Sequence, residues 1–220
     1  MKPIDLSHTI MSGMPQWRGD SQILVIHRQS EHGPSNHMSS SLEFGCHVGT
    51  HIDAPLHFLS GSPGVDEMSL EAFGGTALVV DATEVAKKQT GVGGKPAAMG
   101  LEVLSGEDLG KIDFVLFNTG WDKHWGTDQY YRHWPWLSLE LAEVLVKADL
   151  KGVGLDTPSL DDFGGQVVHD LFAVAGMINI ENLTNLGALP RTGSWFQAFP
   201  LKLLGTEASP VRALAWVEPT

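Results

Sequence analysis

The hydrophobic positions of this chain fall into short runs, and most of the runs are rich in β-branched residues. Glycine, proline, serine or aspartate bounds each run, a pattern that is typical of β-strands. The predicted strands cover residues 22–29, 76–83, 111–120, 151–157, 196–205 and 210–218. In two of them, the uninterrupted segments ALVV and FVLF predict strands that are buried on both faces.

Helical periodicity appears between these strands. A serine precedes a segment in which leucines recur at near-helical spacing, so we predict a helix over residues 138–150. A second helix is predicted over residues 166–179, because apolar residues recur three or four positions apart from Val167 to Ile178. A short third helix is expected over residues 69–73.

The order of these elements indicates the fold class. The strand over 111–120, the helix over 138–150 and the strand over 151–157 form a β–α–β crossover, which favours a parallel strand pair. The other strands predict a mixed sheet with an additional antiparallel part. We therefore expect an α/β fold with mixed β-sheets and flanking helices, in a single domain over residues 1–220. The segment 87–100 is expected to be an exposed loop.

Composition and charge narrow the set of partners. A chain of 220 residues can bury roughly 70% of the surface that its unfolded form exposes, so it needs neither a disulfide nor a metal merely to fold. The net charge of −12 argues against a nucleic-acid partner, because a phosphate backbone requires a basic face. No stretch reaches the roughly 18 apolar residues of a membrane span, so we expect a soluble cytoplasmic protein with no membrane partner. The single cysteine excludes a disulfide framework.

Four titratable side chains crowd into residues 47–58, which read HVGTHIDAPLHF. They are His47, His51, Asp53 and His57. Imidazole and carboxylate are ordinary ligands of Zn²⁺ and Mn²⁺. His47 and His51 would share a side if the chain made a helical turn, and Asp53 could then reach the same ion. A polar loop with solvated histidines is the alternative, but the crowding favours a metal site.

The same segment resembles the HxGTHxDxPxH signature of the cyclase-type metal-dependent hydrolases, a family that includes bacterial kynurenine formamidase and isatin hydrolase. The resemblance continues in GMPQWRGD (13–20), LFNTGWDKHW (116–125), GLDTPSLD (154–161) and GTEASPVRAL (205–214), and in the distal pair His169 and Glu181. One departure is Arg18, at a position where proline is usual in the family.

The resemblance implies a cyclase-like fold of the swivelling β/α type, a homodimer or homotetramer, and one or two Zn²⁺ or Mn²⁺ ions per subunit. The residues implied as metal ligands are His47, His51, Asp53, His169 and Glu181. Asp53 would belong to both metal positions. His57 would be the catalytic general acid and base, and Trp17 would contact the aromatic part of the substrate. Taken alone, His169 would more often be a hydrogen-bonded structural histidine and Glu181 a helix-cap or surface carboxylate, and Trp17 could simply cover the core.

The implied reaction is hydrolysis of an amide C–N bond in an aryl formamide or a cyclic amide, similar to N-formylkynurenine or isatin. A bound ion lowers the pKa of water from 15.7 toward about 7 and so supplies a nucleophile at neutral pH. The chain has no Gly-x-Ser-x-Gly elbow, which argues against a serine nucleophile. The alternatives are a lactone or ester hydrolase of the same family, a non-catalytic metal-binding homologue, and a cupin-like oxygenase.

Overall fold

The computed structural model describes residues 1–17, 25–30, 37–89 and 98–218. The strands are β1 (Lys2–Asp5), β2 (Val25–Ser30), β3 (Ser39–Glu43), β4 (His51–Asp53), β5 (Gly74–Asp81), β6 (Ala98–Met99), β7 (Phe114–Asn118), β8 (Trp136–Leu137), β9 (Gly152–Leu155), β10 (Ile178–Glu181), β11 (Ser194–Gln197), β12 (Ala208–Pro210) and β13 (Leu214–Val217). The α-helices are α1 (Thr83–Gln89), α2 (Leu139–Lys147) and α3 (Val167–Val174). The 3-10 helices are η1 (Pro55–His57), η2 (Leu70–Phe73), η3 (Leu101–Leu104), η4 (Trp121–His124) and η5 (Leu186–Ala188).

One mixed sheet organises the described part of the chain. Its nine strands follow the order β1-β13-β11-β5-β7-β9-β10-β4-β12. The central strands β5, β7, β9 and β10 are parallel, and the strands on either side of them pair antiparallel. Helix α2 connects β7 to β9, so the predicted crossover and the predicted mixed sheet are both confirmed.

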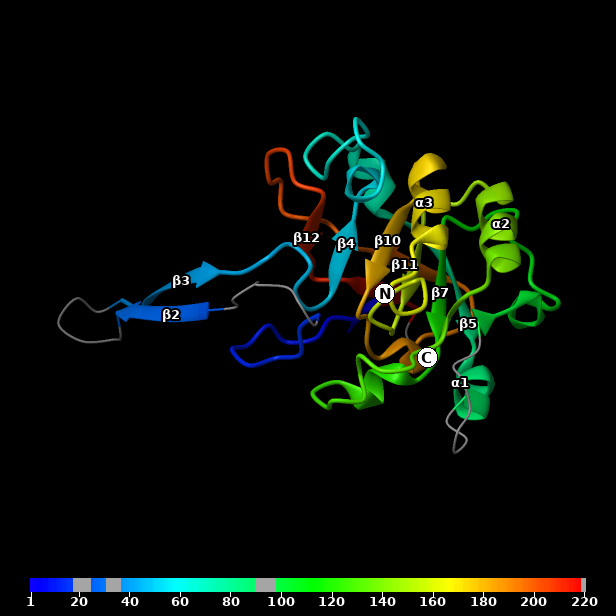
Figure 1. Ribbon diagram of the computed structural model, residues 1–220, viewed down its shortest axis with the longest axis horizontal. Coiled ribbons are helices and arrows are strands. Elements are labelled where there is room, and N and C mark those ends of the chain that lie inside the picture. The colour runs from blue at the N-terminus through cyan, green and yellow to red at the C-terminus, as the bar shows by residue number, and fades with distance from the viewer. Residues whose placement is uncertain (18–24, 31–36, 90–97, 219–220) are drawn as a thin grey trace.

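The two faces of this sheet bury different parts of the core. Helices α2 and α3 lie side by side on one face (Figure 1), where Leu145 and Phe172 pack with the strand residues Val115 and Val153. On the other face, residues from both ends of the sheet meet in one cluster, such as Ile52 of β4 with residues of β1 and β13. The sheet therefore curls around this second cluster, and the metal-ligand candidates lie near its β4 end.

Strands β2 and β3 form a separate antiparallel pair that extends away from the rest of the molecule (Figure 1). Leu42 on this arm is 59% exposed. The first three residues of the predicted strand 22–29, and residues 90–97 of the predicted loop, lie outside the described residues. No helix among the described residues is long and apolar enough to cross a bilayer.

The helix predicted over 166–179 is wrong in its second half. Helix α3 ends at Val174, Gly176 adopts a left-handed φ of 72°, and β10 follows from Ile178. A glycine in this conformation is the usual end of an α-helix. The predicted apolar face is also wrong, because Val174 is 72% exposed while the buried face carries the neighbouring residues Val168, His169 and Phe172.

Three predicted strands also need correction. The strand over 76–83 stops at Asp81, whose carboxylate accepts a hydrogen bond from the Thr83 amide at the start of α1. Only the first two residues of the strand predicted over 196–205 lie in a strand, at the end of β11, and Pro200 forms an isolated bridge with Val211. The strand over 210–218 is β13 alone, with β12 as a separate element. Residues 69–73 do form a short helix, the 3-10 helix η2.

Candidate active site

Four of the five ligand candidates come from three neighbouring elements. His51 and Asp53 are the two ends of β4, and since side chains alternate along a strand they share one face while Ile52 packs in the core. β10 pairs with β4 in an antiparallel register that sets Glu181 directly opposite His51. His169 comes from the buried face of α3, and its Nε2 lies 3.1 Å from Glu181 Oε1. The fold thus brings His169 and Glu181 next to the ligand candidates of the HVGTHIDAPLHF segment.

His47 lies in the turn before β4, so the helical turn considered from its spacing is wrong. Gly49 has a left-handed φ of 63°, a conformation that favours glycine. The carbonyl oxygen of Gly49 accepts hydrogen bonds from His51 Nδ1 at 2.9 Å and from Asn182 Nδ2 at 2.8 Å. The glycine therefore shapes the turn and orients the His51 ring.

Donor atoms converge around the Asp53 carboxylate. Its Oδ1 lies 3.0 Å from His47 Nδ1 and 3.5 Å from His51 Nε2. Glu181 Oε2 also lies 3.5 Å from His51 Nε2. Asp53 Oδ1 is buried and faces these imidazole nitrogens without a well-directed hydrogen bond among the described residues. A buried carboxylate oxygen in this position, surrounded by nitrogen and oxygen atoms that can act as ligands, fits a divalent cation.

Two groups of side chains are close enough to share an ion. One consists of His47, Asp53 and His57, and the other of His51, Asp53 and Glu181, with ligand atoms within 4.8 Å of one another in each group. Asp53 belongs to both groups. The donor set of imidazoles and carboxylates suits Zn²⁺ or Mn²⁺.

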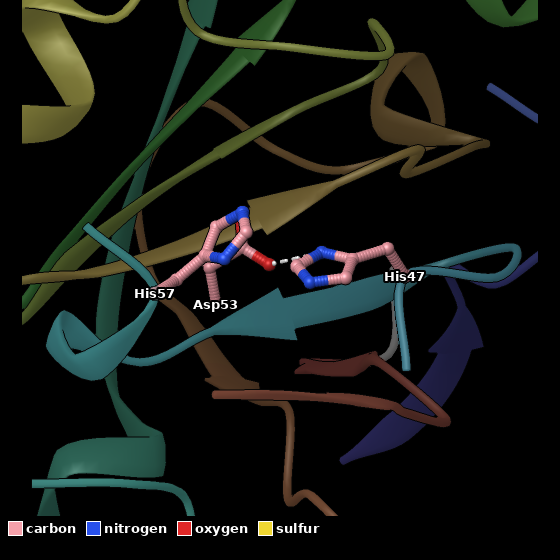
Figure 2. A group of neighbouring side chains, drawn as sticks. All are labelled: His47, Asp53 and His57. Carbon is pink, nitrogen blue, oxygen red and sulfur yellow. Dashed lines mark ion pairs between the residues drawn. The ribbon is translucent and has the colours of Figure 1, made fainter. Parts of the chain in front are cut away.

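His57 approaches the cluster from the segment that follows β4. It is the last residue of η1, a 3-10 helix that begins at Pro55. Figure 2 shows the Asp53 carboxylate directed toward His47, with the His57 ring beside it. The ring centroids of His57 and His47 are 4.2 Å apart. His57 therefore lies at the metal candidates while its side chain still reaches solvent.

The charges of the cluster shift the proton affinities of its members. Burial disfavours an imidazolium at His47, but the nearby carboxylates, chiefly Asp53, outweigh burial and raise the pKa of His47 to about 9. Burial also opposes charge at His169, yet Asp161 and Glu181 raise the pKa of His169 to about 10. Desolvation by the pocket walls lowers the pKa of His57, and Asp53 offsets this only in part.

A cavity of about 500 Å³ opens above these residues. Its wall includes Trp17, Phe58 and Tyr131, and its polar lining includes Asp162. Trp17 stacks on Phe163 with ring centroids 5.4 Å apart and 16° between the ring planes. Trp17 therefore lies in the pocket of its own chain, in a position to contact a ligand. The neighbouring Arg18 lies outside the described residues.

The comparison with known families agrees with this geometry. The sequence model of the Cyclase family matches residues 4–162, which is more than half of the chain. The chain belongs to the Cyclase family. It is 30% identical to a kynurenine formamidase from Salinibacter ruber over 222 aligned residues, which cover 97% of each chain. The resemblance seen in the sequence motifs is therefore confirmed.

Solved structures place the fold of this Cyclase-family chain in the same group. Isatin hydrolase A from Ralstonia solanacearum superposes with a TM-score of 0.87 at 28% identity, over 99% of this chain and 92% of that one. A structure described as a potential metal-dependent hydrolase with cyclase activity gives a TM-score of 0.79 at 27% identity, over 100% and 99% of the two chains. The predicted fold class and the predicted enzyme class, a metal-dependent hydrolase, are confirmed.

Two carboxylates of this Cyclase-family chain contact the ligand histidines but are absent from the residues singled out in the sequence. Glu207 Oε1 lies 3.2 Å from His47 Nε2, and Asp161 Oδ2 lies 2.6 Å from His169 Nδ1. Both residues fall inside motif segments, 205–214 and 154–161, so the motifs marked their neighbourhood. The contacts themselves depend on the tertiary structure.

Asp156 and Ser159, both in the motif segment 154–161, have different roles in the structure. Asp156 is buried and accepts hydrogen bonds from the Thr119 hydroxyl and from the amides of Thr119 and Gly120. It therefore holds the turn that follows β7. Ser159 lines the pocket.

Proposed function

We propose that this chain hydrolyses the amide C–N bond of an aryl formamide or a cyclic aryl amide, with one or two Zn²⁺ or Mn²⁺ ions per subunit. The observation that carries the proposal is the position of Asp53. Its buried carboxylate is shared by two groups of possible metal ligands beneath an aromatic-walled cavity of about 500 Å³. Cavities of this size hold small organic ligands.

The resemblance implies two positions that share Asp53, with His47 and His51 at the first and Glu181 and His169 at the second. In the structure His47 is grouped with His57, and His51 is grouped with Glu181, which His169 contacts. When bound, the ions supply an acidified water and polarise the carbonyl of the substrate. The carboxylates of Asp53 and Glu181 hold the ligand imidazoles within reach of an ion.

His57 would carry the proton. Because desolvation lowers its pKa, the ring is neutral near pH 7 and a ring nitrogen can accept a proton from the attacking water. The same nitrogen can then donate that proton to the leaving nitrogen of the amide. His57 suits this role better than His47, whose ring nitrogens face Asp53 and Glu207 and whose ring is assigned to the metal.

The aromatic wall supports an aryl substrate. Trp17, Phe58 and Tyr131 surround the space above the ligand residues, so a planar ring can stack there while its amide faces His57. The kynurenine formamidase and isatin hydrolase among the relatives are named for substrates of this aromatic kind. The homodimer or homotetramer expected from the resemblance is part of this proposal, and sedimentation velocity measures it.

A substrate panel tests the proposal. The metal-loaded protein is incubated with N-formylkynurenine, isatin, an aryl lactone and an alkyl amide, and product formation is followed by absorbance. We expect turnover of at least one aryl amide and little turnover of the alkyl amide. Turnover of the lactone alone would favour the ester hydrolase instead. A protein that binds metal and hydrolyses none of these substrates would be a non-catalytic homologue.

Trp17→Ala is expected to raise KM for an aryl amide by about tenfold with a smaller change in kcat. An aromatic contact contributes about 0.5–1.5 kcal/mol beyond its buried area, and about 1.4 kcal/mol corresponds to a factor of ten. Steady-state kinetics measures the two constants. Trp17→Phe is the control, since it keeps a ring against Phe163 and should retain most of the affinity. An unchanged KM in Trp17→Ala would remove Trp17 from the substrate site.

Metal affinity is expected to rise with pH between about 6 and 9. In the ligand-free site the raised pKa values, about 9 for His47 and about 10 for His169, keep both rings protonated at neutral pH. A metal ion binds the neutral ring, so binding releases protons. The metal affinity therefore rises up to about tenfold per pH unit for each proton released. Competition between the loaded protein and a chelator at several pH values measures this. An affinity independent of pH would contradict it.

A further inference from the structure

Three of the ligand candidates are histidines: His47, His51 and His169. In each of them the two ring nitrogens face different partners. One nitrogen faces the carboxylates of Asp53 or Glu181, and the other lies against an acceptor outside the ligand set. For His51 that acceptor is the carbonyl oxygen of Gly49, 2.9 Å from Nδ1. For His169 and His47 the acceptors are carboxylates, which carry a full charge and can be replaced by mutation.

Asp161 holds the His169 ring in one tautomer. Its Oδ2 lies 2.6 Å from His169 Nδ1 and also accepts the His169 amide proton at 3.1 Å. Its Oδ1 accepts the Val168 amide proton at 3.0 Å. Because the carboxylate is surrounded by donors, Nδ1 must carry a proton. His169 Nε2, 3.1 Å from Glu181, is then the nitrogen that can donate a lone pair to a metal.

Glu207 makes the corresponding contact to His47 through the opposite ring nitrogen. Its Oε1 lies 3.2 Å from His47 Nε2, while His47 Nδ1 lies 3.0 Å from Asp53 Oδ1. Glu207 directly precedes β12, whose Ala208 is paired with Asp53, so the sheet fixes its position. The Glu207 side chain is 38% exposed, against 7% for Asp161. Solvent therefore weakens this contact relative to that of Asp161.

We propose that Asp161 and Glu207 are positioning residues that fix the ring orientation and the proton placement of His169 and His47, and that each controls retention of a different metal ion. The inference rests on the proposed metal site. A carboxylate on the far nitrogen orients a ligand imidazole and makes it a stronger donor, and losing such a partner typically costs 10- to 100-fold in metal affinity. Asp161 acts on the Glu181 side of the site, and Glu207 acts on the His47 side.

The test compares metal retention in D161N and E207Q. An amide at position 161 offers an N–H either to His169 Nδ1 or to the Val168 amide, and both arrangements set two donors against each other. If the N–H faces the ring, His169 must place its proton on Nε2, the metal-binding nitrogen. We therefore expect D161N to weaken retention of one ion by about 10- to 100-fold. E207Q should have a smaller effect, on the other ion.

The experiment starts from the zinc-loaded protein and a chelator, and the ions retained per chain are followed with time by atomic emission. Asp162→Asn is the matched control, because Asp162 lines the same pocket but lies outside both groups of ligand candidates. Ser138→Ala is the control for lost helix capping, since Ser138 Oγ accepts the Leu141 amide proton of α2 far along the chain from the ligands. Both controls should retain zinc as the wild type does.

Long-range ¹H–¹⁵N NMR of the zinc-loaded protein reports which nitrogen of each ligand histidine carries the proton. We expect a protonated Nδ1 on His169 and a protonated Nε2 on His47 in the wild type. D161E restores a carboxylate and should recover part of the zinc retention. If Asp161 acted only by capping α3, this recovery would not be required. If D161N does not fold, E207Q and the NMR spectrum of the wild type carry the test.

The inference would be overturned by zinc release from D161N and E207Q at the wild-type rate, or by the opposite proton placement on both rings. Equal losses in D161N and Ser138→Ala would also overturn it, by assigning the effect to helix stability. A wild type that retains no divalent ion would overturn the proposed function itself. The two failures are thus distinguishable.

Discussion

Replacing His57 with alanine is expected to lower kcat by about 10²- to 10⁴-fold while the number of metal ions bound per chain stays unchanged. His57 would move the proton between the attacking water and the leaving nitrogen, and no other ring in the pocket has both a lowered pKa and contact with solvent among the described residues. Steady-state kinetics and metal analysis of the same preparation measure the two quantities together.

His124→Ala is the matched control for this variant. His124 is the last residue of the 3-10 helix η4, just as His57 is the last residue of η1, but it packs edge-on against Trp121 outside the pocket lining. It should keep the activity of the wild type. Loss of a metal ion from His57→Ala would show that His57 is a ligand, grouped with His47 and Asp53, and would end its assignment as the proton carrier.

Asp53→Asn is expected to empty both metal positions and to lower activity by about 10³-fold or more. The Asp53 carboxylate belongs to both ligand groups, and the neighbouring imidazoles of His51 and His47 overcome burial and hold its pKa well below the usual range, so it is ionised. The amide removes this charge and one acceptor oxygen. A bound metal contributes several kcal/mol to the stabilisation of the transition state, which corresponds to about this loss in rate.

Metal analysis and kinetics check this result, with circular dichroism to verify the fold. The control is Asp162→Asn, the same chemical change at another aspartate of the pocket, whose carboxylate accepts the Phe163 amide proton at 2.7 Å. Asp162→Asn should keep its metal and most of its activity. Full metal content in Asp53→Asn would contradict the shared position of Asp53.

The sequence alone predicts the part of the site that is formed by residues close together in the chain. His51 and Asp53 are two positions apart, and any strand sets such residues on one face, so their cooperation depends on no distant contact. The spacing of the histidines does not predict the turn at Gly49. A helical turn and a turn at a left-handed glycine both bring His47 near His51. The crossover from β7 through α2 to β9 followed from the order of apolar runs.

The remaining errors have physical causes. Gly176 is the signal that ends α3, but the apolar spacing continues past it to Ile178 and so predicts a longer helix. The roles of Glu207 and Asp161 had no local signal. Glu207 and His47 are 160 positions apart, and their contact exists only because β12 pairs with β4. Pairing between distant strands is not encoded in the periodicity of either strand.

The length and position of β4 have a consequence for how this site can vary. The strand has three residues, and it is paired on one side with β10 and on the other with β12. A shift of one residue would turn Ile52 toward the pocket and both ligands toward the core, since the side-chain period of a strand is two. An insertion or deletion within β4 would therefore disrupt the site, and a designer who transfers the pocket to another protein must preserve both strand pairings together with the ligands.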